Sequence, residues 1–305
     1  MSTSNTSSPS PSGAGHLMES ELRSQPQVWA RATQLVAERN SLPAAGQRVA
    51  VVGCGTSWFM GQSYAALREG AGQGVTDAFA ASEAFVDRSY DAVIGISRSG
   101  TTTEVLELLE RVKGTTRTVA IIGDPESPMN DLADDVIQLP FADEKSVVQT
   151  RFATTTLAFL RASLGEDLQR AIADAESVIA ADLEPQLLTA EQYTFLGRGW
   201  TVGLAHEAAL KMREASQTWT ESYPAMEYRH GPISIATSGR ITWAFGEVPT
   251  GLTDQVLATG AHFEHQAVDP LADLVRTQRV ALERARAAGL DPDQPRNLSR
   301  AVILD

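Results

Sequence analysis

The stretch from Asp91 to Leu108 constrains the fold of this chain more than any other. Its apolar run 92–96 predicts a buried strand, the polar residues 97–100 predict a turn, and helical spacing resumes near Val105. The run 48–53 is a second apolar strand, and it leads into a Gly-rich turn and another helical pattern. Because strand, turn and helix in this order form the repeating unit of parallel sheets, we expect an α/β fold.

The other predicted elements divide this fold into two halves. Further strands are expected at 77–81, 118–123, 136–139, 193–196, 241–245 and 261–268. Helical patterns are expected at 18–39, 59–67, 146–164, 165–183, 202–215 and 271–288. The sequence therefore predicts two doubly wound parallel sheets in tandem, with helices on both faces. We expect a disordered Ser-rich tail at 1–16, an N-terminal subdomain with lead-in helices at 17–183 and a C-terminal subdomain at 184–305.

The composition excludes several classes of protein. The net charge is −13 at pH 7 and the pI is about 4.9, so we expect no basic surface for nucleic acid. The single cysteine, Cys54, rules out an internal disulfide and a metal site built from cysteines. No apolar run reaches the ~20 residues of a membrane span, and the N-terminal residues lack the pattern of a secretion signal. We expect a cytoplasmic protein that acts on a small molecule.

The turn after the strand 92–96 is rich in hydroxyl side chains, which are Ser97, Ser99, Thr101, Thr102 and Thr103. A helix N-terminus attracts anions through its free amides and its dipole, so these hydroxyls would complete a phosphate site. Ser and Thr also commonly cap helices, and the turn alone does not separate the two interpretations. Ligands of parallel sheets bind where the strand order reverses, and a second hydroxyl-bearing loop at 56–57 belongs to the same edge. The second half has no counterpart of this turn, so we expect one phosphate site per chain.

Three ionisable residues share one face of the helix predicted at 202–215. Glu207, Lys211 and Glu214 follow one another at positions i, i+4 and i+7. An amine between two carboxylates can tune the acidity of a catalytic base. The alternative is a solvated Glu–Lys–Glu stripe, which this spacing more often indicates. Lys211 is one of only three lysines in the sequence, which suggests that its amine matters and not its charge alone.

Six motifs in this order resemble the sugar isomerase (SIS) family. They are GCGTS at 53–57, SRSGTT at 97–102, EKSVVQTR at 144–151, EAALKMRE at 207–214, RHGP at 229–232 and DQPRNL at 293–298. Over residues 18–305 the chain is most similar to the isomerase half of glucosamine-6-phosphate synthase and to the stand-alone amino-sugar-phosphate deaminases and isomerases. The resemblance implies two SIS subdomains, an active-site tail at the C-terminus and a homodimer whose active site is shared between the subunits.

The resemblance also implies roles for individual residues. The substrate would be bound by residues of two turns and one loop, which are Thr56, Ser57, Ser97, Arg98, Ser99 and Thr102 at the 6-phosphate and Val147 and Gln149 at the sugar. Glu214 would be the base that moves the carbon 2 proton, with Lys211 and Glu207 beside it. His230 would open the sugar ring from the neighbouring subunit. The other histidines have no spacing that would complete a metal site, and we expect no metal or other cofactor.

Two departures from the family narrow the expected reaction. The synthase begins with a glutaminase domain whose nucleophile is an N-terminal cysteine, whereas this chain begins with the Ser-rich tail, so we do not expect synthesis from glutamine. Arg300 stands where the family has the lysine that forms a Schiff base with the open sugar. A guanidinium cannot form an imine, so we expect no covalent intermediate at this position. Arg300 could still stabilise an enolate oxygen.

We therefore expect an enzyme that removes the carbon 2 proton of glucosamine 6-phosphate or N-acetylglucosamine 6-phosphate. Reprotonation at carbon 1 would give isomerisation, which ends in deamination for the free amine. Loss of the carbon 3 hydroxyl would give dehydration, which Arg300 makes plausible for the N-acetyl sugar. The sequence leaves these two outcomes open, together with the gluco or galacto configuration. The alternative from another class is a sugar-phosphate sensor without catalysis, although the sequence has no helix-turn-helix pattern.

Overall fold

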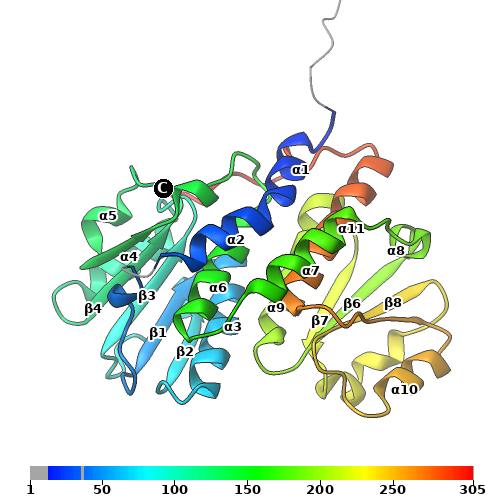
Figure 1. Ribbon diagram of the computed structural model, residues 1–305, viewed down its shortest axis with the longest axis horizontal. Helices are drawn as coiled ribbons and strands as arrows, with labels where there is room; N and C mark the ends of the chain where they lie inside the picture. Colours follow the sequence, from blue (N-terminus) through cyan, green and yellow to red (C-terminus); the bar gives the residue numbers. More distant parts are fainter. Residues whose placement is uncertain (1–12, 36–37, 305) are drawn as a thin grey trace, which may run out of the picture.

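The computed structural model describes residues 13–35 and 38–304, which form two β-sheets with helices packed around them (Figure 1). In spatial order the first sheet contains β2 (Thr76–Ala80), β1 (Val49–Gly53), β3 (Ala92–Ser97), β4 (Arg117–Ile122) and β5 (Asp135–Gln138). The second contains β7 (Thr220–Pro224), β6 (Gln192–Gly197), β8 (Arg240–Phe245) and β9 (His262–Glu264). All pairings are parallel. The predicted α/β fold with two doubly wound parallel sheets is confirmed.

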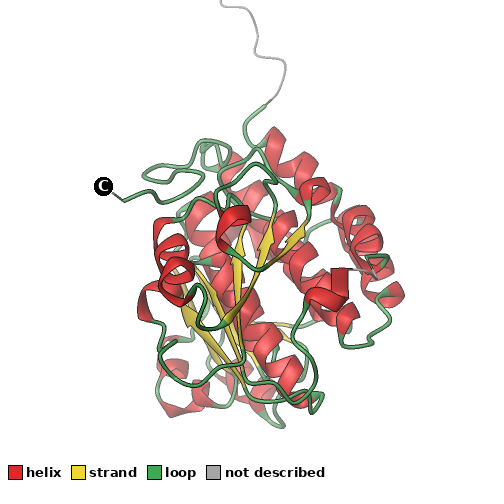
Figure 2. Cartoon of the chain, turned by 90° about the vertical axis from the view of Figure 1, so that its left-hand side faces the viewer, coloured by secondary structure: helices red, strands yellow, loops and turns green. Residues whose placement is uncertain are grey.

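The helices connect these strands and precede the first of them. The α-helices are α1 (His16–Arg23), α2 (Gln25–Thr33), α3 (Thr56–Gly70), α4 (Thr103–Val112), α5 (Met129–Leu132), α6 (Arg151–Ser163), α7 (Gln169–Ala180), α8 (Pro185–Thr189), α9 (Thr201–Ser216), α10 (Leu252–Ala258) and α11 (Pro270–Ala287). Short 3-10 turns are η1 (Glu38–Ser41), η2 (Ala81–Glu83), η3 (Pro140–Ala142), η4 (Glu227–His230) and η5 (Pro232–Ile235). Helices flank the strands on both sides in Figure 2.

The apolar strands of the first sheet are buried on both faces. Val49 and Val51 of β1 belong to the large core, which also contains residues of α3 and α6. Ala50 and Val52 point the other way, into a smaller core formed with α4. This alternation follows from the two-residue period of a strand, and burial on both faces explains the continuous apolar run.

The large core extends from the first sheet to the second. It contains Tyr193, Phe195 and Trp243 of the second sheet together with apolar residues of α6, α9 and α11. Figure 1 shows α6, α7, α9 and α11 between the two sheets. Because this core joins both sheets, the division of the chain at 183–184 stays a prediction.

Several predicted boundaries differ from the structure for identifiable reasons. The helix predicted from residue 146 begins at Arg151, because the buried Glu144 carboxylate accepts the backbone N–H groups of Thr150, Arg151 and Phe152. Residues 146–150 therefore form a loop. The strand predicted at 261–268 is only the three residues of β9, which lies at the edge of its sheet.

Some elements were not predicted, and one prediction lies largely outside the described residues. The edge strand β7 was missed because its sequence TESYP is polar and ends in proline. The short helices α5, α8 and α10 were also missed. Of the tail predicted at 1–16, only residues 13–16 belong to the described chain, and His16 already begins α1.

Candidate functional site

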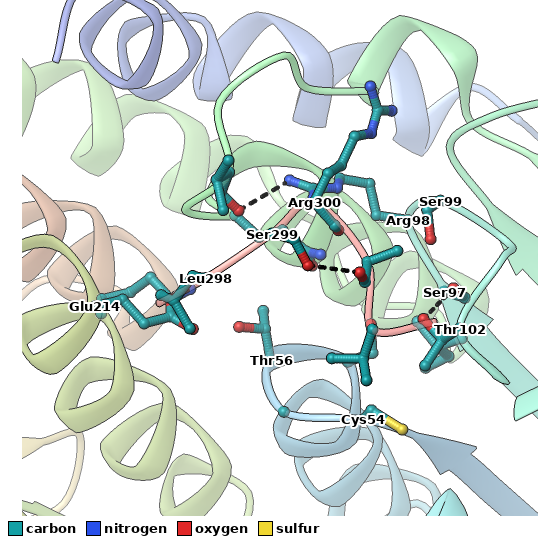
Figure 3. A pocket seen from close by; sticks show the side chains of 18 residues that line it. Cys54, Thr56, Ser97, Arg98, Ser99, Thr102, Glu214, Leu298, Ser299 and Arg300 are labelled. Carbon is teal, nitrogen blue, oxygen red and sulfur yellow. Dashed lines mark hydrogen bonds and ion pairs between the residues drawn. The ribbon is translucent and has the colours of Figure 1, made fainter. Parts of the chain in front are cut away.

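A pocket of about 190 Å³ lies beyond the carboxyl ends of β1 and β3. The order of the first sheet reverses between these two strands, which is where ligands of doubly wound sheets bind. The pocket is lined by the turns after β1 and β3, a loop before α6, the C-terminal half of α9 and the end of the chain. These residues are Cys54, Gly55, Thr56, Ser57, Ile96, Ser97, Arg98, Ser99, Thr102, Val147, Gln149, Lys211, Glu214, Leu298, Ser299, Arg300, Ala301 and Val302. Figure 3 shows these side chains.

The turn after β1 is shaped by two glycines. A Cβ atom at Gly53 would lie 2.9 Å from the Ser57 side chain, so only glycine lets α3 begin this close to the strand. Gly55 has a φ of 51°, in the left-handed region that glycine tolerates. The turn brings Thr56 and Ser57 to the first turn of α3, where both line the pocket.

The turn after β3 supplies the other hydroxyls. Ser97 Oγ accepts the backbone N–H of Gly100 at 3.0 Å, and Ser99 Oγ accepts the hydroxyl of Thr101 at 3.0 Å. In the described structure Thr102, the residue before α4, makes no side-chain hydrogen bond that caps this helix. The helix-cap interpretation therefore does not account for these residues. We call Thr56, Ser57, Ser97, Ser99 and Thr102, which all line the pocket, the hydroxyl cradle.

The three ionisable residues of α9 form one cluster at the opposite side of the pocket. Lys211 Nζ contacts the Glu214 carboxylate and lies 3.6 Å from Glu207 Oε1. The side chains of Lys211 and Glu207 are 1% exposed and that of Glu214 is 20% exposed. The solvated-stripe alternative is therefore wrong for Lys211 and Glu207. Lys211 and Glu214 line the pocket, whereas Glu207 lies behind them.

Burial controls the ionisation of this cluster. It raises the pKa of Glu207 to about 8, against the opposing effect of Lys211. Glu207 is therefore mainly protonated at pH 7. Burial also acts to lower the pKa of Lys211, but Glu207 and Glu214, both ionised at the high pH where a lysine titrates, outweigh it and raise this pKa. The charge of Lys211 is thus balanced mainly by Glu214, the carboxylate that reaches the pocket.

The C-terminal tail, residues 298–304, passes over the hydroxyl cradle. The Val302 carbonyl accepts the Thr103 N–H at 3.3 Å, and Leu304 N–H donates to Thr103 Oγ1 at 2.9 Å. The guanidinium of Arg300 donates to both carboxylate oxygens of Asp143, at 2.6 and 2.8 Å. In Figure 3 this side chain points away from Glu214 and the cradle. Arg300 thus lines the pocket while its guanidinium is engaged outside it.

The remaining predicted residues divide between the pocket and the rest of the chain. Val147 and Gln149 line the pocket, and Gln149 Oε1 is a buried acceptor with no partner among the described residues. Arg98 lines the pocket, but its guanidinium donates to backbone carbonyls. His230 is exposed at the end of η4 and is not part of the pocket of its own chain.

Several pocket residues were not predicted. Cys54 lies between the two glycines of the first turn, and burial raises its thiol pKa to about 11, so it stays protonated. Leu298, Ser299, Ala301 and Val302 come from the tail, whose path the spacing of polar residues does not reveal. Asp143 was also missed, although it lies directly before the EKSVVQTR motif.

The described residues offer neither a metal site nor a membrane-spanning helix. They contain no group of three or more His, Cys, Asp or Glu side chains arranged to hold a metal ion. None of their helices combines the length and the apolar character that a membrane span requires.

The sequence of this chain is related to larger proteins. It is 27% identical to the glutamine–fructose-6-phosphate aminotransferase (isomerizing) of Xanthomonas campestris pv. campestris, over 95% of this chain and 59% of the relative. It is 28% identical to that of Sulfolobus acidocaldarius, over 85% of this chain and 50% of the relative. The chain thus spans a little over half the length of the curated relatives it matches.

Solved structures share the fold at lower identity. Glucosamine-6-phosphate deaminase from Thermotoga maritima matches with a TM-score of 0.77 and 22% identity, over 93% of this chain and 99% of that chain. The C-terminal domain of glucosamine-fructose-6-phosphate aminotransferase from Francisella tularensis matches with a TM-score of 0.74 and 21% identity, over 94% and 100%. Tagatose-6-phosphate ketose/aldose isomerase from Escherichia coli matches with a TM-score of 0.76 and 18% identity, over 93% and 98%.

The model of the SIS domain matches residues 43–164, which contain the first sheet and the hydroxyl cradle. The sequence relatives and the solved structures extend the similarity over both sheets. The chain therefore carries a match to the SIS domain at residues 43–164 and is similar in sequence to the isomerizing aminotransferases over the part that it shares with them.

Proposed function

We propose that this protein removes the carbon 2 proton of a hexosamine 6-phosphate, with glucosamine 6-phosphate or N-acetylglucosamine 6-phosphate as the substrate. One observation carries the proposal: Glu214, paired with buried Lys211, faces the same small pocket as the hydroxyl cradle. Figure 3 shows Glu214 and the Ser97–Thr102 turn on opposite sides of this pocket. The names of the relatives support the class of reaction, because they include an isomerizing aminotransferase, a deaminase and a ketose/aldose isomerase of sugar phosphates.

The cradle would hold the phosphate without a free cation. Among the described lining residues the basic side chains are Arg98, Lys211 and Arg300, and each is already engaged with acceptors of the protein. Hydroxyls remain as donors, together with the amides at the starts of α3 and α4 other than those of Ser57 and Thr103, which donate to the carbonyls of Cys54 and Val302. Helix dipoles favour an anion there. A cavity of about 190 Å³ is also small compared with the ~300–1,000 Å³ of drug-sized sites, which suits a single sugar.

Glu214 would act as the base on the open-chain sugar. Its carboxylate takes the carbon 2 proton, and the electron pair of the C–H bond moves toward the aldehyde oxygen to give an enolate. Lys211 Nζ contacts this carboxylate and holds it at the edge of the pocket. Return of the proton to carbon 1 completes the isomerisation. With a free amine the product is an imine at carbon 2, which water hydrolyses to a ketose phosphate and ammonia.

Dehydration is the second outcome that the site supports. The same enolate can expel the carbon 3 hydroxyl, which leaves as water after taking up a proton, and a 2,3-unsaturated aldehyde remains. An N-acetyl group does not form the imine of the deamination route, and Arg300 cannot form a Schiff base in place of a lysine. A role for Arg300 at the enolate oxygen requires that its guanidinium leave Asp143.

His230 would reach the pocket from a second copy of the chain. It is exposed and lies outside the pocket of its own chain, so a homodimer with a shared site explains both its position and its motif. Mixing inactive Glu214→Gln and His230→Ala chains tests this arrangement. Random reassembly should restore about a quarter of the sites, because half of the dimers are mixed and each has one intact site. No recovery after verified subunit exchange would contradict a shared site.

The reaction itself is tested by exchange and product analysis. Purified protein in heavy water should replace the carbon 2 proton of one of the two sugars, and mass spectrometry should detect either loss of water or release of ammonia. Glu214→Gln should abolish exchange but keep sugar-phosphate binding, whereas Glu176→Gln on the exposed face of α7 should change neither. If the wild type binds the sugars but gives neither exchange nor product, the protein is a sensor and the proposal fails.

A further inference from the structure

Arg98 belongs to one wall of the pocket and bonds to two others. From the turn after β3, its Nη1 donates to the carbonyl of Ser146 at 2.9 Å and to that of Val147 at 3.4 Å. Its Nη2 donates to the carbonyl of Arg300 at 2.6 Å. The residue is only 3% exposed. In Figure 3 its side chain runs from the cradle side of the pocket to the tail. One buried guanidinium therefore connects the turn, the loop before α6 and the C-terminal tail.

The loop before α6 has anchors of its own. The buried Glu21 carboxylate of α1 accepts the N–H of Lys145 at 2.6 Å. The Ser146 hydroxyl donates to the Val148 carbonyl at 2.8 Å, within the same loop. These contacts hold the loop even without Arg98, so it offers a fixed point against which a second segment can be positioned.

The tail depends more on its hydrogen bonds. Its apolar side chains bury little area, since Val302 is 51% exposed, Ile303 72% and Leu304 55%. Burial of apolar surface is what normally holds a chain segment in place, and here it contributes little. Besides Arg98, the polar anchors are the two backbone bonds to Thr103 and the partly exposed ion pair of Arg300 with Asp143. The bond from Arg98 is the one whose donor side chain is buried.

Arginine suits this position better than any other residue. Its planar guanidinium presents donors in several fixed directions, so it can bond carbonyls of two segments at the same time. Burial lowers the pKa of Arg98, and the nearby Glu144 carboxylate opposes this effect. Glu144 thus compensates the buried charge. Nη1 and Nη2 donate to the backbone of the pocket walls, whereas the buried Nε has no partner among the described residues.

We propose that Arg98 is a positioning residue that holds the tail over the sugar pocket, and that it does not bind the phosphate directly. The inference rests on the proposed function only where it concerns turnover. The role differs from the one implied by resemblance, in which Arg98 donates to the phosphate from the turn. Loss of Arg98 should therefore release the tail first and weaken sugar binding as a consequence.

Hydrogen exchange of the free protein tests the contact without any substrate. Arg98→Gln should raise the exchange rate of amides in 298–304 at least tenfold, while the amides of β3 and β4 keep their protection. Arg98→Lys should give the same result, because one ammonium nitrogen cannot reach the carbonyls of both segments. The matched control is Arg68→Gln. Arg68 is 1% exposed and also donates to three backbone carbonyls, those of Ala44, Gln47 and Gly74, but it lies away from the pocket.

Ligand affinities separate positioning from direct binding. Arg98→Gln should raise the KM or Kd for the sugar phosphate more than tenfold, because the sugar loses its cover. The Kd of inorganic phosphate, which needs only the cradle, should change less than threefold. In Arg98→Ala, added guanidinium ion should restore both tail protection and sugar affinity. Arg68→Gln should lower the unfolding midpoint but leave tail exchange and both affinities unchanged.

Two results would overturn the proposal. Unchanged tail exchange in both Arg98→Gln and Arg98→Lys would show that the tail does not depend on this side chain. An equal loss of affinity for inorganic phosphate and for the sugar phosphate would show that Arg98 binds the anion itself. Neither hydrogen exchange nor ligand affinity requires turnover. If the wild-type protein does not exchange the carbon 2 proton, the proposed function is wrong, but these two measurements still test the role of Arg98.

Discussion

The two sheets of this protein begin alike, but the hydroxyl cradle and its pocket lie at the first sheet. Both β1 and β6 end in a Gly-X-Gly turn, at 53–55 and at 197–199. A Cβ atom would lie 2.9 Å from Ser57 at Gly53 and 2.2 Å from the Thr201 carbonyl oxygen at Gly197. The last glycine of each turn has a positive φ, of 51° and 57°. In both halves, a Gly-X-Gly turn therefore allows the helix to begin close to the end of the strand.

The difference lies in how the polar groups at each crevice are satisfied. In the second half the Thr201 hydroxyl donates to the Phe245 carbonyl and accepts the Arg198 N–H, and Arg198 pairs with Glu247. These groups are therefore occupied within the protein. In the first half the corresponding edge carries the hydroxyl cradle and an open pocket. The strand order reverses in each sheet, but the hydroxyls that line a pocket come from the turns after β1 and β3 of the first sheet.

Removing two hydroxyls of the cradle should have the largest effect, because it takes away donors that distinguish the crevice of the first sheet from that of the second. Ser97→Ala together with Ser99→Ala should raise the KM for a sugar phosphate by at least about 100-fold, since hydrogen bonds to a charged group contribute about 1.5–3 kcal/mol each. Steady-state kinetics or calorimetric binding measures the change. Thr250→Ala, in the loop after β8, is the matched control and should leave KM unaltered. An unchanged KM in the double variant would mean that the phosphate binds elsewhere.

The contact between α3 and α9, the helices that follow the two glycine turns, should not accommodate a larger side chain. A Cβ atom at Gly203 of α9 would lie 2.3 Å from the Phe59 carbonyl oxygen and 2.4 Å from Ser63 Oγ of α3. Gly203→Ala should destabilise the protein by about 1–3 kcal/mol, because the two helices must separate. The midpoint of urea unfolding measures this effect. Gly70→Ala at the end of α3 has open space around it and should be neutral or stabilising, and equal losses in both variants would reject the close-contact argument.

Patterns of local sequence were sufficient for most of the fold. Runs of mostly apolar residues predicted β1, β3, β4, β6 and β8, because strands buried on both faces favour apolar residues at successive positions. The edge strand β7 and the short strand β9 lack this requirement, so their sequences carry little signal. The start of α6 was misplaced because its cap is the carboxylate of Glu144, which lies several residues before the helix in the sequence. This carboxylate accepts three backbone N–H groups at the helix start. Such contacts depend on the folded chain and not on periodicity.

The site was predictable where its residues share an element. Spacing alone placed Glu207, Lys211 and Glu214 on one helix face, and the structure brings their charged groups together. The orientation of a long side chain was not predictable in this way. Arg98 and Arg300 both line the pocket, yet their guanidinium groups bond carbonyls and Asp143, which come from parts of the chain far away in sequence.

Glu207 should make the stability of the protein depend on pH. Because burial raises its folded-state pKa from 4.5 to about 8, it stays protonated while the unfolded chain ionises, and stability falls as pH rises from about 5 to 8. Glu207→Gln keeps the shape of the group but cannot ionise. The variant should therefore gain on the wild type by at least about 1.4 kcal/mol over this window, the equivalent of one pKa unit. Parallel urea titrations at pH 5 and pH 8 measure it, and a constant difference would contradict the assigned pKa.

The smallest effect is expected at the crevice of the second sheet. Arg198 and Glu247 form an ion pair whose side chains are 48% and 69% exposed, and such surface pairs contribute about 0–1 kcal/mol. Arg198→Ala should thus change the free energy of unfolding by less than about 1 kcal/mol and leave both KM and kcat unchanged. A clear loss of sugar-phosphate affinity would show that the second crevice also takes part in binding. The two halves would then differ in which part of the ligand each crevice binds. The bonds that Thr201 and Arg198 make within the protein would not exclude the second crevice from binding.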